Sequence, residues 1–261
     1  MFFHQPWNSL SNYNYNIRFY KDDIWEKHIH KNFELVYVIK GRLNCTLNNE
    51  SFVMTEGEFA LCLPYEIHSY LPDRETEYWI IVFSGDFVHS FSKEITNKIG
   101  SGRGFRVKKC IEEYVKEQLI YNNIPTMFTL KSCLYAICEE YLSSVSLTDN
   151  KNSKSELVGI IIDFVQERYA EKISLRDIAK VAGYDYNYMS RCFKNIFNMS
   201  FTDFVNLYRI ENAIELLETT NDKITDIALK SGFQSVRSFN EVFKKNVKVT
   251  PMQYKKTSRK V

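Results

Sequence analysis

Residues 177–183 read DIAKVAG, and residues 226–232 read DIALKSG. Each copy is followed, after a short polar gap, by a segment with a Phe-Lys pair, Phe193-Lys194 in the first and Phe243-Lys244 in the second. The glycines at positions 183 and 232 are 49 residues apart and the Phe-Lys pairs are 50 apart, so the second gap holds one extra residue. Such spacing indicates one structural unit written twice.

Both copies fit a helix-turn-helix, which needs a small residue where its helices cross, glycine in the tight turn and apolar inner faces. Ala179 and Ala228 are the predicted crossing residues, and Gly183 and Gly232 suit turn positions with a positive φ. The other predicted buried residues are Ile178, Tyr184, Met189 and Cys192 in the first copy, and Ile227, Phe233, Phe239 and Val242 in the second. An ordinary helical hairpin would explain one copy but explains two matched copies poorly.

Capping residues and apolar periodicity define the predicted helices. Good N-cap residues stand at their starts, namely Ser174, Asp185, Thr225 and Ser235. Between the two copies, apolar residues recur at three-to-four spacing, which predicts one long amphipathic helix that couples the units rigidly. These residues are Phe201, Phe204, Val205, Tyr208, Ala213, Ile214 and Leu217.

Over about residues 155–256 the chain resembles the AraC family of transcription regulators. The matching residues are Asp177-Ile178-Ala179, Gly183-Tyr184, Tyr188-Met189-Ser190-Arg191, Phe193-Lys194, Arg209, Ala213, Leu216-Leu217, Ile227-Ala228, Gly232-Phe233, Phe243-Lys244-Lys245, Thr250-Pro251 and Tyr254. The resemblance implies double-stranded DNA, a small-molecule effector and a second copy of the chain as partners, and it admits RNA polymerase as another. Three positions depart from the family pattern: Asn198 and Lys248 replace glycines, and Glu241 replaces a common Arg, which leaves the sequence preference open.

Length and composition point to two ordinary domains in the cytoplasm. The chain has 261 residues, no run of eighteen apolar residues and no charged-then-apolar leader, so a membrane is not an expected partner. The six cysteines show no C-x2-C pairing and are expected to be reduced, mostly buried thiols. A polar stretch at 147–155 reads as a linker, giving expected boundaries of 1–105, 106–147 and 148–261.

The charge is distributed unevenly between the two halves. Residues 151–261 hold 19 Lys and Arg against 13 Asp and Glu, a net charge of +6, whereas residues 1–150 hold 15 against 19, a net charge of −4. A basic half suits the phosphate backbone of DNA, whose neutralisation supplies most of the affinity that does not depend on sequence.

The N-terminal half reads as an antiparallel barrel or sandwich, so the predicted fold class is α+β, with a helical C-terminal domain. From Phe33 to Ser84 short apolar runs alternate with turn signals such as Asn48-Asn49 and Glu56-Gly57. Within this region lie His28-x-His30-x3-Glu34-x6-Gly41 and Gly57-x6-Pro64-x3-His68. These segments resemble the two motifs of the cupin barrel, the second only approximately, and the AraC family commonly carries such a sensor barrel.

Two interpretations of this motif compete. In metal-dependent cupins the residues at the positions of His28, His30, Glu34 and His68 bind a metal, and an open site of that kind supports oxygenase or isomerase chemistry. Alternatively, the same polar groups line a pocket for a small ligand or only satisfy one another. Because regulators of this architecture sense rather than catalyse, we expect a ligand pocket without metal, cofactor or enzyme activity. The alternative is a metal-dependent cupin enzyme fused to a DNA-binding module; a third, an interaction module without DNA affinity, is also open.

Strand alternation extends the predicted pocket. If Glu34 faces the interior, then Val36, Val38 and Lys40 share that face, while Leu35, Tyr37 and Ile39 point to the other. Lys40 near the mouth would meet a polar ligand, with Tyr70 and Tyr78 as aromatic walls. Stacking combined with a few polar groups suits a sugar, although simple packing would explain the same residues.

Residues 106–146 have a helical pattern with two apolar stripes. One contains Ile111, Tyr114, Val115, Leu119 and Ile120, and the other contains Met127, Leu130, Leu134, Ile137 and Tyr141. The resemblance implies a homodimer contact here; packing against the barrel of the same chain is the alternative.

The second helix of each unit is expected to enter a major groove of DNA. In the first unit Asn187, Ser190 and Arg191 form the exposed face, and Arg191 is the candidate for reading guanine. In the second unit the matching residues are Val236, Arg237, Asn240 and Glu241, and Glu241 either accepts from cytosine or orients Arg237. Lys194, Lys244 and Lys245 are expected to contact phosphates. Whether binding activates or represses transcription stays open.

Overall fold

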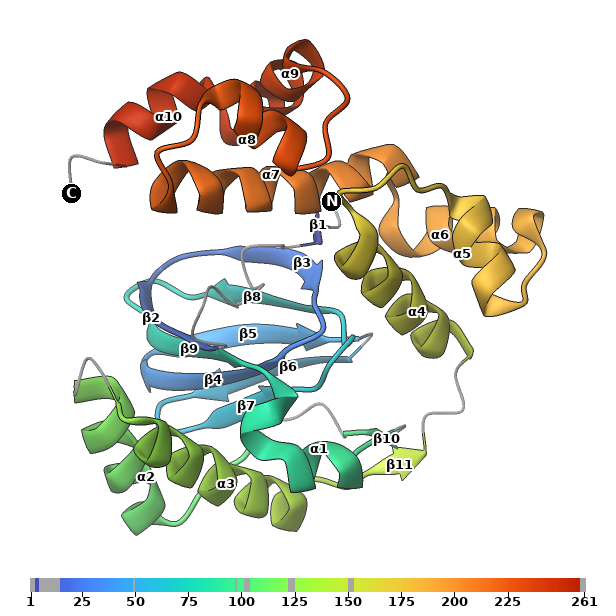
Figure 1. The fold of residues 1–261 in the computed structure, drawn as a ribbon. Coiled ribbons are helices and arrows are strands. Elements are labelled where there is room, and N and C mark those ends of the chain that lie inside the picture. The colour runs from blue at the N-terminus through green and yellow to red at the C-terminus, as the bar shows by residue number, and fades with distance from the viewer. Residues whose placement is uncertain are drawn as a thin grey trace. The chain divides into compact units, whose positions relative to one another are not determined.

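The structure, a computed structural model, describes residues 3–4, 15–48, 50–96, 98–100, 104–121, 125–149 and 153–258. Residues 15–155 and 156–258 form two compact units. The first unit is mainly β-sheet with helices and the second is all helical, which confirms the predicted α+β class (Figure 1). Among the residues described, none of the helices combines the length and apolar character needed to cross a membrane.

Two antiparallel sheets face each other in the first unit. One has the order β1-β3-β8-β5-β6 and the other has the order β2-β9-β4-β7. The strands are β1 (Phe3–His4), β2 (Tyr15–Lys21), β3 (Trp25–Ile29), β4 (Phe33–Lys40), β5 (Arg42–Leu47), β6 (Glu50–Thr55), β7 (Phe59–Cys62), β8 (His68–Pro72) and β9 (Glu77–Phe83). A short pair, β10 (Lys98–Ile99) and β11 (Thr148–Asp149), lies apart from them, so β11 occupies part of the predicted linker.

The alternation predicted for β4 is confirmed. Val36 and Val38 lie in the core between the sheets, together with residues from both of them. Leu35 and Tyr37 point to the opposite face and pack against the helices. Lys40 departs from the pattern because the pairing of β4 with β9 shifts register between Val38 and Lys40. A bulge of this kind re-aims the residue that follows it.

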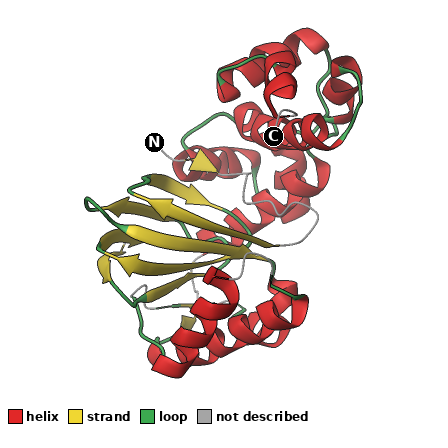
Figure 2. Ribbon diagram, turned by 90° about the vertical axis from the view of Figure 1, so that its left-hand side faces the viewer, coloured by secondary structure: helices red, strands yellow, loops and turns green. Residues whose placement is uncertain are grey.

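Helices cover the outer face of the sheet β2-β9-β4-β7 (Figures 1 and 2). They are η2 (Gly85–Val88), α1 (His89–Glu94), α2 (Lys109–Val115), the π-helical η3 (Lys116–Tyr121) and α3 (Met127–Ser144). Most residues of the two predicted stripes are buried in this contact: Val115, Leu119, Ile120, Leu130, Leu134, Ile137 and Tyr141. Packing against the barrel of the same chain therefore accounts for most of both stripes.

The second unit contains seven helices among its described residues. They are α4 (Ser153–Arg168), α5 (Leu175–Ala182), α6 (Tyr186–Phe197), α7 (Phe201–Thr219), α8 (Ile224–Lys230), α9 (Val236–Val247) and α10 (Pro251–Ser258). The pairs α5–α6 and α8–α9 are the two predicted helix-turn-helix units, and α7 is the predicted linking helix. Gly183 and Gly232 have φ angles of 70° and 86°, so both turns use the conformation that favours glycine.

Two details of the predicted units are wrong. Tyr184, Cys192 and Val242 are only half-buried, whereas Phe193 and Phe243 of the repeated Phe-Lys pairs are buried in the helical cores. The reason is the helical period: four residues from Met189 or Phe239 return closer to the inner face than three do. Thr225 lies inside α8, whose N-cap is Lys223, while Ser174, Asp185 and Ser235 are N-caps as predicted.

Arg209 of α7 contacts both the segment that follows α4 and the turn of the second helix-turn-helix pair. Its Nε donates to the carbonyl of Tyr169 at 2.8 Å, and its Nη2 donates to the carbonyl of Glu171 at 2.9 Å. The same guanidinium lies 5.9 Å from the ring centroid of Phe233, which follows the second turn. Gly232 sits against this segment too, because a Cβ there would lie 2.6 Å from Ala170 Cα.

Candidate functional site

Four polar side chains meet inside the barrel. His28 belongs to β3, His30 follows it directly, Glu34 lies on β4 and His68 begins β8. All four are buried, with at most 3% of each residue exposed, and one candidate ligand atom from each lies within 4.8 Å of the others. The four residues singled out from the sequence motif therefore lie together in the structure.

Backbone carbonyls fix the orientation of all three imidazole rings. The Nδ1 atoms of His28 and His68 lie 2.8 Å from the carbonyls of Glu26 and Glu66, respectively. The Nδ1 atom of His30 lies 3.0 Å from the carbonyl of Asn32. A carbonyl oxygen can only accept, so each Nδ1 carries the proton and each Nε2 of a neutral ring presents a lone pair.

Glu34 is the acid toward which these rings turn. Its Oε2 lies 3.1 Å from His30 Nε2, and its Oε1 lies 3.5 Å from His68 Nε2. Tyr70 donates its hydroxyl to Oε1 at 2.7 Å, and Cys62 Sγ lies 3.2 Å from that hydroxyl. Tyr70 is therefore part of the cluster, as a partner of the carboxylate.

Within the cluster, the pKa shifts favour the charged forms of Glu34 and His68. Burial raises the pKa of Glu34, but the charge of His68 and the hydrogen bond to His30 outweigh it and hold that pKa well below its usual range. Burial lowers the pKa of His68, but Glu34 outweighs burial and raises it. Burial and the charge of His68 lower the pKa of His28 well below its ordinary value. The arrangement thus suits either a shared proton or a bound cation.

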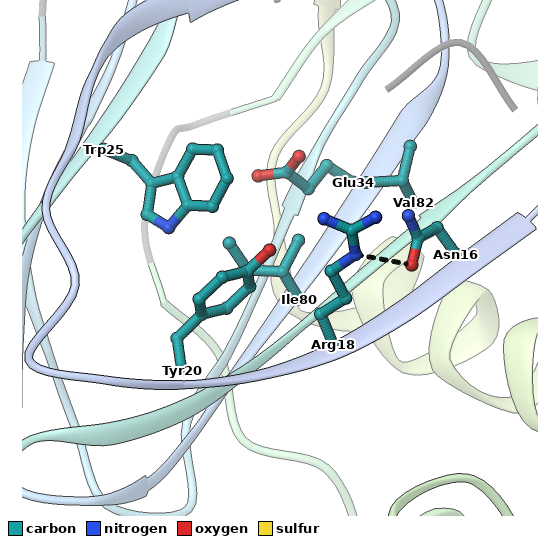
Figure 3. A pocket seen from close by; sticks show the side chains of 7 residues that line it. All are labelled: Asn16, Arg18, Tyr20, Trp25, Glu34, Ile80 and Val82. Carbon is teal, nitrogen blue, oxygen red and sulfur yellow. Dashed lines mark hydrogen bonds between the residues drawn. The ribbon is translucent and has the colours of Figure 1, made fainter. Parts of the chain in front are cut away.

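A pocket opens beside the cluster and shares Glu34 with it (Figure 3). Its lining residues are Asn16, Arg18, Tyr20, Trp25, Glu34, Ile80 and Val82. Arg18 Nε donates to Asn16 Oδ1 at 3.2 Å, and the rings of Tyr20 and Trp25 meet edge-on at 5.0 Å. The cavity has a volume of about 10 Å³, which is room for about one water molecule.

Of the seven predicted ligand-binding residues, Glu34 alone is among the lining residues; His28, His30, His68 and Tyr70 belong to the cluster beside the pocket, and Lys40 and Tyr78 belong to neither. Lys40 is exposed and lies 3.7 Å from Glu75, because the bulge in β4 turns it away from the interior. Tyr78 is buried behind the pocket wall, where its hydroxyl donates to the carbonyl of Asp23 and its ring stacks on Tyr20. Neither side chain lines this pocket.

Sequence reasoning missed Asn16, Arg18, Tyr20 and Trp25, which build most of the pocket. They lie on β2 and β3, before Phe33, where the predicted barrel strands began. The alternation of Ile17 and Phe19 with Arg18 and Tyr20 was the signal that could have found them. It is weak because aromatic residues stand on both faces.

The exposed side of α6 carries the residues predicted for the first DNA contact. Asp185 caps the helix by accepting hydrogen bonds from the backbone of Asn187 at 2.8 Å and Tyr188 at 3.2 Å. Asn187, Arg191 and Lys194 are exposed and Ser190 is half-buried. These side chains lie opposite the buried Met189, Phe193 and Phe197.

The exposed side of α9 has the same layout with different chemistry. Arg237, Asn240, Glu241, Lys244 and Lys245 are exposed, and Val236 is half-buried. Arg237 Nε lies 3.1 Å from Glu241 Oε1, one helical turn away. Lys245 Nζ lies 3.1 Å from Asp203 Oδ1 on α7. Two cations of this face, Arg237 and Lys245, therefore already have acidic partners within the protein.

Comparisons with known proteins agree with this geometry. Residues 16–115 match the model of an AraC-like ligand binding domain, and residues 178–257 match that of a helix-turn-helix domain. An uncharacterized HTH-type transcriptional regulator of Bacillus subtilis, YisR, is 26% identical over 93% of this chain and 92% of its own length. The melibiose operon regulatory protein of Escherichia coli K12 is 25% identical over 89% of this chain and 84% of its own.

A similar fold is seen in solved structures of ToxT from Vibrio cholerae. One of them, without ligand, has a TM-score of 0.57 at 17% identity and covers 94% of this chain and 97% of its own. Another holds an unsaturated fatty acid and has a TM-score of 0.55. The family matches and the named relatives are regulators, which confirms the expectation that this chain is not an enzyme. The chain belongs to the AraC family and is a ligand-responsive transcriptional regulator.

Proposed function

We propose that the chain reads a specific DNA sequence through α6 and α9, each placed in a major groove. The observation that carries this proposal is the pair of exposed faces, Asn187, Ser190 and Arg191 on α6 and Val236, Arg237, Asn240 and Glu241 on α9. Both faces project from one unit with a net charge of +6 over residues 151–261. An α-helix fits the major groove, where each base pair presents a distinct pattern of donors and acceptors.

The two faces differ in how their arginines are held. Arg191 is the candidate for bidentate contact with guanine. Arg237 has the same chemistry but lies within 3.1 Å of Glu241, so that carboxylate would orient Arg237 toward a base. Val236, at the start of α9, is a candidate for contact with a thymine methyl group.

The lysines supply affinity without sequence information. Lys194 and Lys244 are exposed at the last turns of their helices and are candidates for phosphate contacts. Lys245 would contribute less, because Asp203 lies 3.1 Å from its ammonium group.

Two substitutions separate base reading from phosphate binding. Arg191→Ala should weaken binding to the preferred sequence by about 1 to 3 kcal/mol and relax one base position. Lys244→Ala should weaken all sequences alike and reduce the dependence of binding on salt. Fluorescence anisotropy with a selected operator and with random DNA, over a range of salt, measures both effects. Equal losses on both DNAs for Arg191→Ala would show that Arg191 does not read a base.

We assign effector binding to residues 1–105 and propose a sugar as the first class to test. Tyr20 and Trp25 offer stacking surfaces, and Asn16 and Arg18 offer hydrogen-bond donors. The relative named for the melibiose operon supports this choice. A sugar ring exceeds the present cavity, so binding would require the exposed Arg18 to move. Thermal shifts across panels of sugars and fatty acids test the class; a response to fatty acids alone would contradict it.

We also propose that residues 106–147 form a homodimer contact. Tyr121 and Phe128 are 72% and 88% exposed, while Ile120 and Leu130 pack on the barrel. Phe128→Asp should shift the sedimentation coefficient from dimer to monomer, whereas a monomeric wild-type chain at micromolar concentration would contradict the assignment. We further propose that residues 148–261 bind double-stranded DNA. RNA polymerase is proposed as a further partner, and the cytoplasm as the place where the protein meets DNA and polymerase.

A further inference from the structure

We propose that Arg176 and Tyr186 form a further contact with the DNA backbone, in which the tyrosine ring holds the arginine side chain toward a phosphate beside α6. Arg176 lies on α5 and supplies the charge, whereas Tyr186 begins α6 and is a positioning residue. The inference rests on the proposed placement of α6 in a major groove. It adds two residues that belong to neither of the exposed reading faces.

The pair is built from the starts of two adjacent helices. Arg176 is in the first turn of α5 and Tyr186 is the first residue of α6 (Figure 1). The guanidinium carbon lies over the Tyr186 ring at 4.6 Å from its centroid, within the range of a cation–π contact, and both residues are exposed. A guanidinium held over a ring keeps the N–H groups at its edge available to donate.

The charge of Arg176 has no acidic partner. Over the part of the chain that the structure describes, the ring of Tyr186 is the partner of this guanidinium, and it forms no ion pair with a carboxylate. The acids next to the pair in the sequence, Asp177 and Asp185, both accept hydrogen bonds that cap α5 and α6. A cation in the first turn of a helix is also disfavoured by the helix dipole. The charge therefore stays available to an anion outside the chain.

The position of the pair favours phosphate as that anion. Tyr186 and Ser190 are four residues apart on α6, so the pair borders the exposed face that we place in the groove. In a helix-turn-helix the first helix crosses the DNA backbone while the second lies in the groove, so a side chain of α5 meets phosphates rather than bases. A guanidinium can donate two parallel hydrogen bonds to a phosphate. The contact with Tyr186 restricts Arg176 beforehand, so less side-chain freedom is lost on binding.

The second helix-turn-helix unit lacks this pair. Once the extra gap residue is allowed, the positions that match Arg176 and Tyr186 hold Thr225 and Val236. The hydroxyl of Thr225 donates to Asp226 at 3.3 Å, and Val236 is half-buried. The second unit thus has neither a charge nor an aromatic ring at these positions. We therefore expect one additional phosphate contact, made by the first unit.

The salt dependence of DNA binding tests the charge. The full-length chain is titrated with an operator selected from a random pool and with random duplex DNA. Arg176→Ala should weaken binding to both by at least about threefold, and should reduce the slope of log affinity against log salt by about 1. Arg168→Ala is the matched control, because Arg168 also rests on a ring, that of Phe164, but is already paired with Glu171 at 2.9 Å. It should leave the affinity and the slope unchanged.

Substitutions of Tyr186 test the positioning role. Tyr186→Phe keeps the ring and should retain the wild-type affinity. Tyr186→Leu removes the ring and should weaken binding about twofold to fivefold without changing the salt slope, because the charge of Arg176 remains. In the Tyr186→Leu background, Arg176→Ala should cost less than it does in the wild type, since the effects of residues in contact do not add. Thermal melting followed by circular dichroism shows that each variant is folded.

Three results would overturn the inference. One is an unchanged salt slope in folded Arg176→Ala, and another is additive losses in the double variant. The third is an equal loss for Tyr186→Phe and Tyr186→Leu, which would mean that the tyrosine hydroxyl contacts the DNA itself. A wild-type chain without DNA affinity would refute the proposed DNA contacts as a whole. Operator binding by the wild type, with an unchanged slope in Arg176→Ala, would refute the Arg176 contact alone.

Discussion

Both helix-turn-helix units have a glycine in the turn, but the two glycines are needed for different physical reasons. Gly183 and Gly232 both have a left-handed backbone, with φ of 70° and 86°. A Cβ on Gly183 would meet nothing within 4 Å, whereas one on Gly232 would lie 2.6 Å from Ala170 Cα and 2.9 Å from its carbonyl oxygen. The first glycine is required by its dihedral angles alone, and the second also by close contact with backbone. A sequence repeat therefore does not imply a repeated environment.

The largest expected effect comes from the crowded turn. Gly232→Ala should destabilise the helical unit by about 2 to 5 kcal/mol, since it combines an unfavourable positive φ with overpacking against backbone. Gly183→Ala should cost only about 1 to 2 kcal/mol, the cost of the dihedral angle. Urea unfolding followed by circular dichroism at 222 nm gives both values. Equal costs at the two glycines would mean that the Ala170 contact relaxes without penalty.

The next effect distinguishes the two reading faces. Glu241→Ala should release Arg237. The difference in binding free energy between the specific and the random DNA should then shrink by about 1 kcal/mol or more, within the range of a single base contact. The substitution should also raise affinity for random DNA slightly, because a negative charge near phosphates is lost. Glu215→Ala removes an exposed carboxylate from the linking helix and serves as the charge-matched control. An unchanged difference for Glu241→Ala would separate Glu241 from base reading.

A smaller difference separates the ends of the two second helices. Both α6 and α9 end in a left-handed residue, Asn198 with φ of 49° and Lys248 with φ of 67°. Lys248→Gly should stabilise the unit by about 0.5 to 1 kcal/mol, partly offset by the loss of the hydrogen bond from Lys248 Nζ to the carbonyl of Lys245. Asn198→Gly should gain less, because Asn tolerates this conformation better. Melting temperatures rank the two variants, and the reverse order would contradict this account.

The smallest effect concerns the starts of the first helices. The backbone N–H and the hydroxyl of Ser174 donate to Asp177 at 2.8 and 2.7 Å, whereas Lys223 caps α8 without a side-chain hydrogen bond. Lys223→Ser would recreate the same arrangement with Asp226 and should add about 0.5 to 1 kcal/mol. A melting temperature no higher than that of the wild type would rule out this capping.

The cap at Ser174 also gives a pH dependence with a definite sign. Hydrogen bonds from Ser174 hold the pKa of Asp177 below its ordinary value of 3.8. A carboxyl whose pKa falls on folding stabilises the folded state above its ordinary pKa and loses that effect as the pH falls through the lower folded value. Asp177→Asn should therefore lower the melting temperature at pH 7 and change it little near pH 2. A constant difference at both pH values would contradict the role of the charge.

Sequence patterns predicted what depends on local periodicity and on spacing. The alternation of Val36 and Val38 with Leu35 and Tyr37, the four-residue cluster and the two turn glycines all belong to this class. Lys40 was misplaced because a bulge depends on pairing with a strand far away in the chain. The pocket residues on β2 were missed because β2 and β4 both had to pair with β9 before Arg18 and Glu34 could line one pocket. The contact of Gly232 with Ala170 has no local signal at all.

Arg209, on the helix α7 that joins the two helix-turn-helix pairs, holds the carbonyls of Tyr169 and Glu171. We therefore expect the distance between the two pairs to be fixed, so that it cannot adjust to the DNA. An operator with extra base pairs between its two half-contacts would lose one of them, even if a full helical turn were inserted and the phase restored. The spacing between half-contacts would then be as much a part of the recognised signal as the bases themselves.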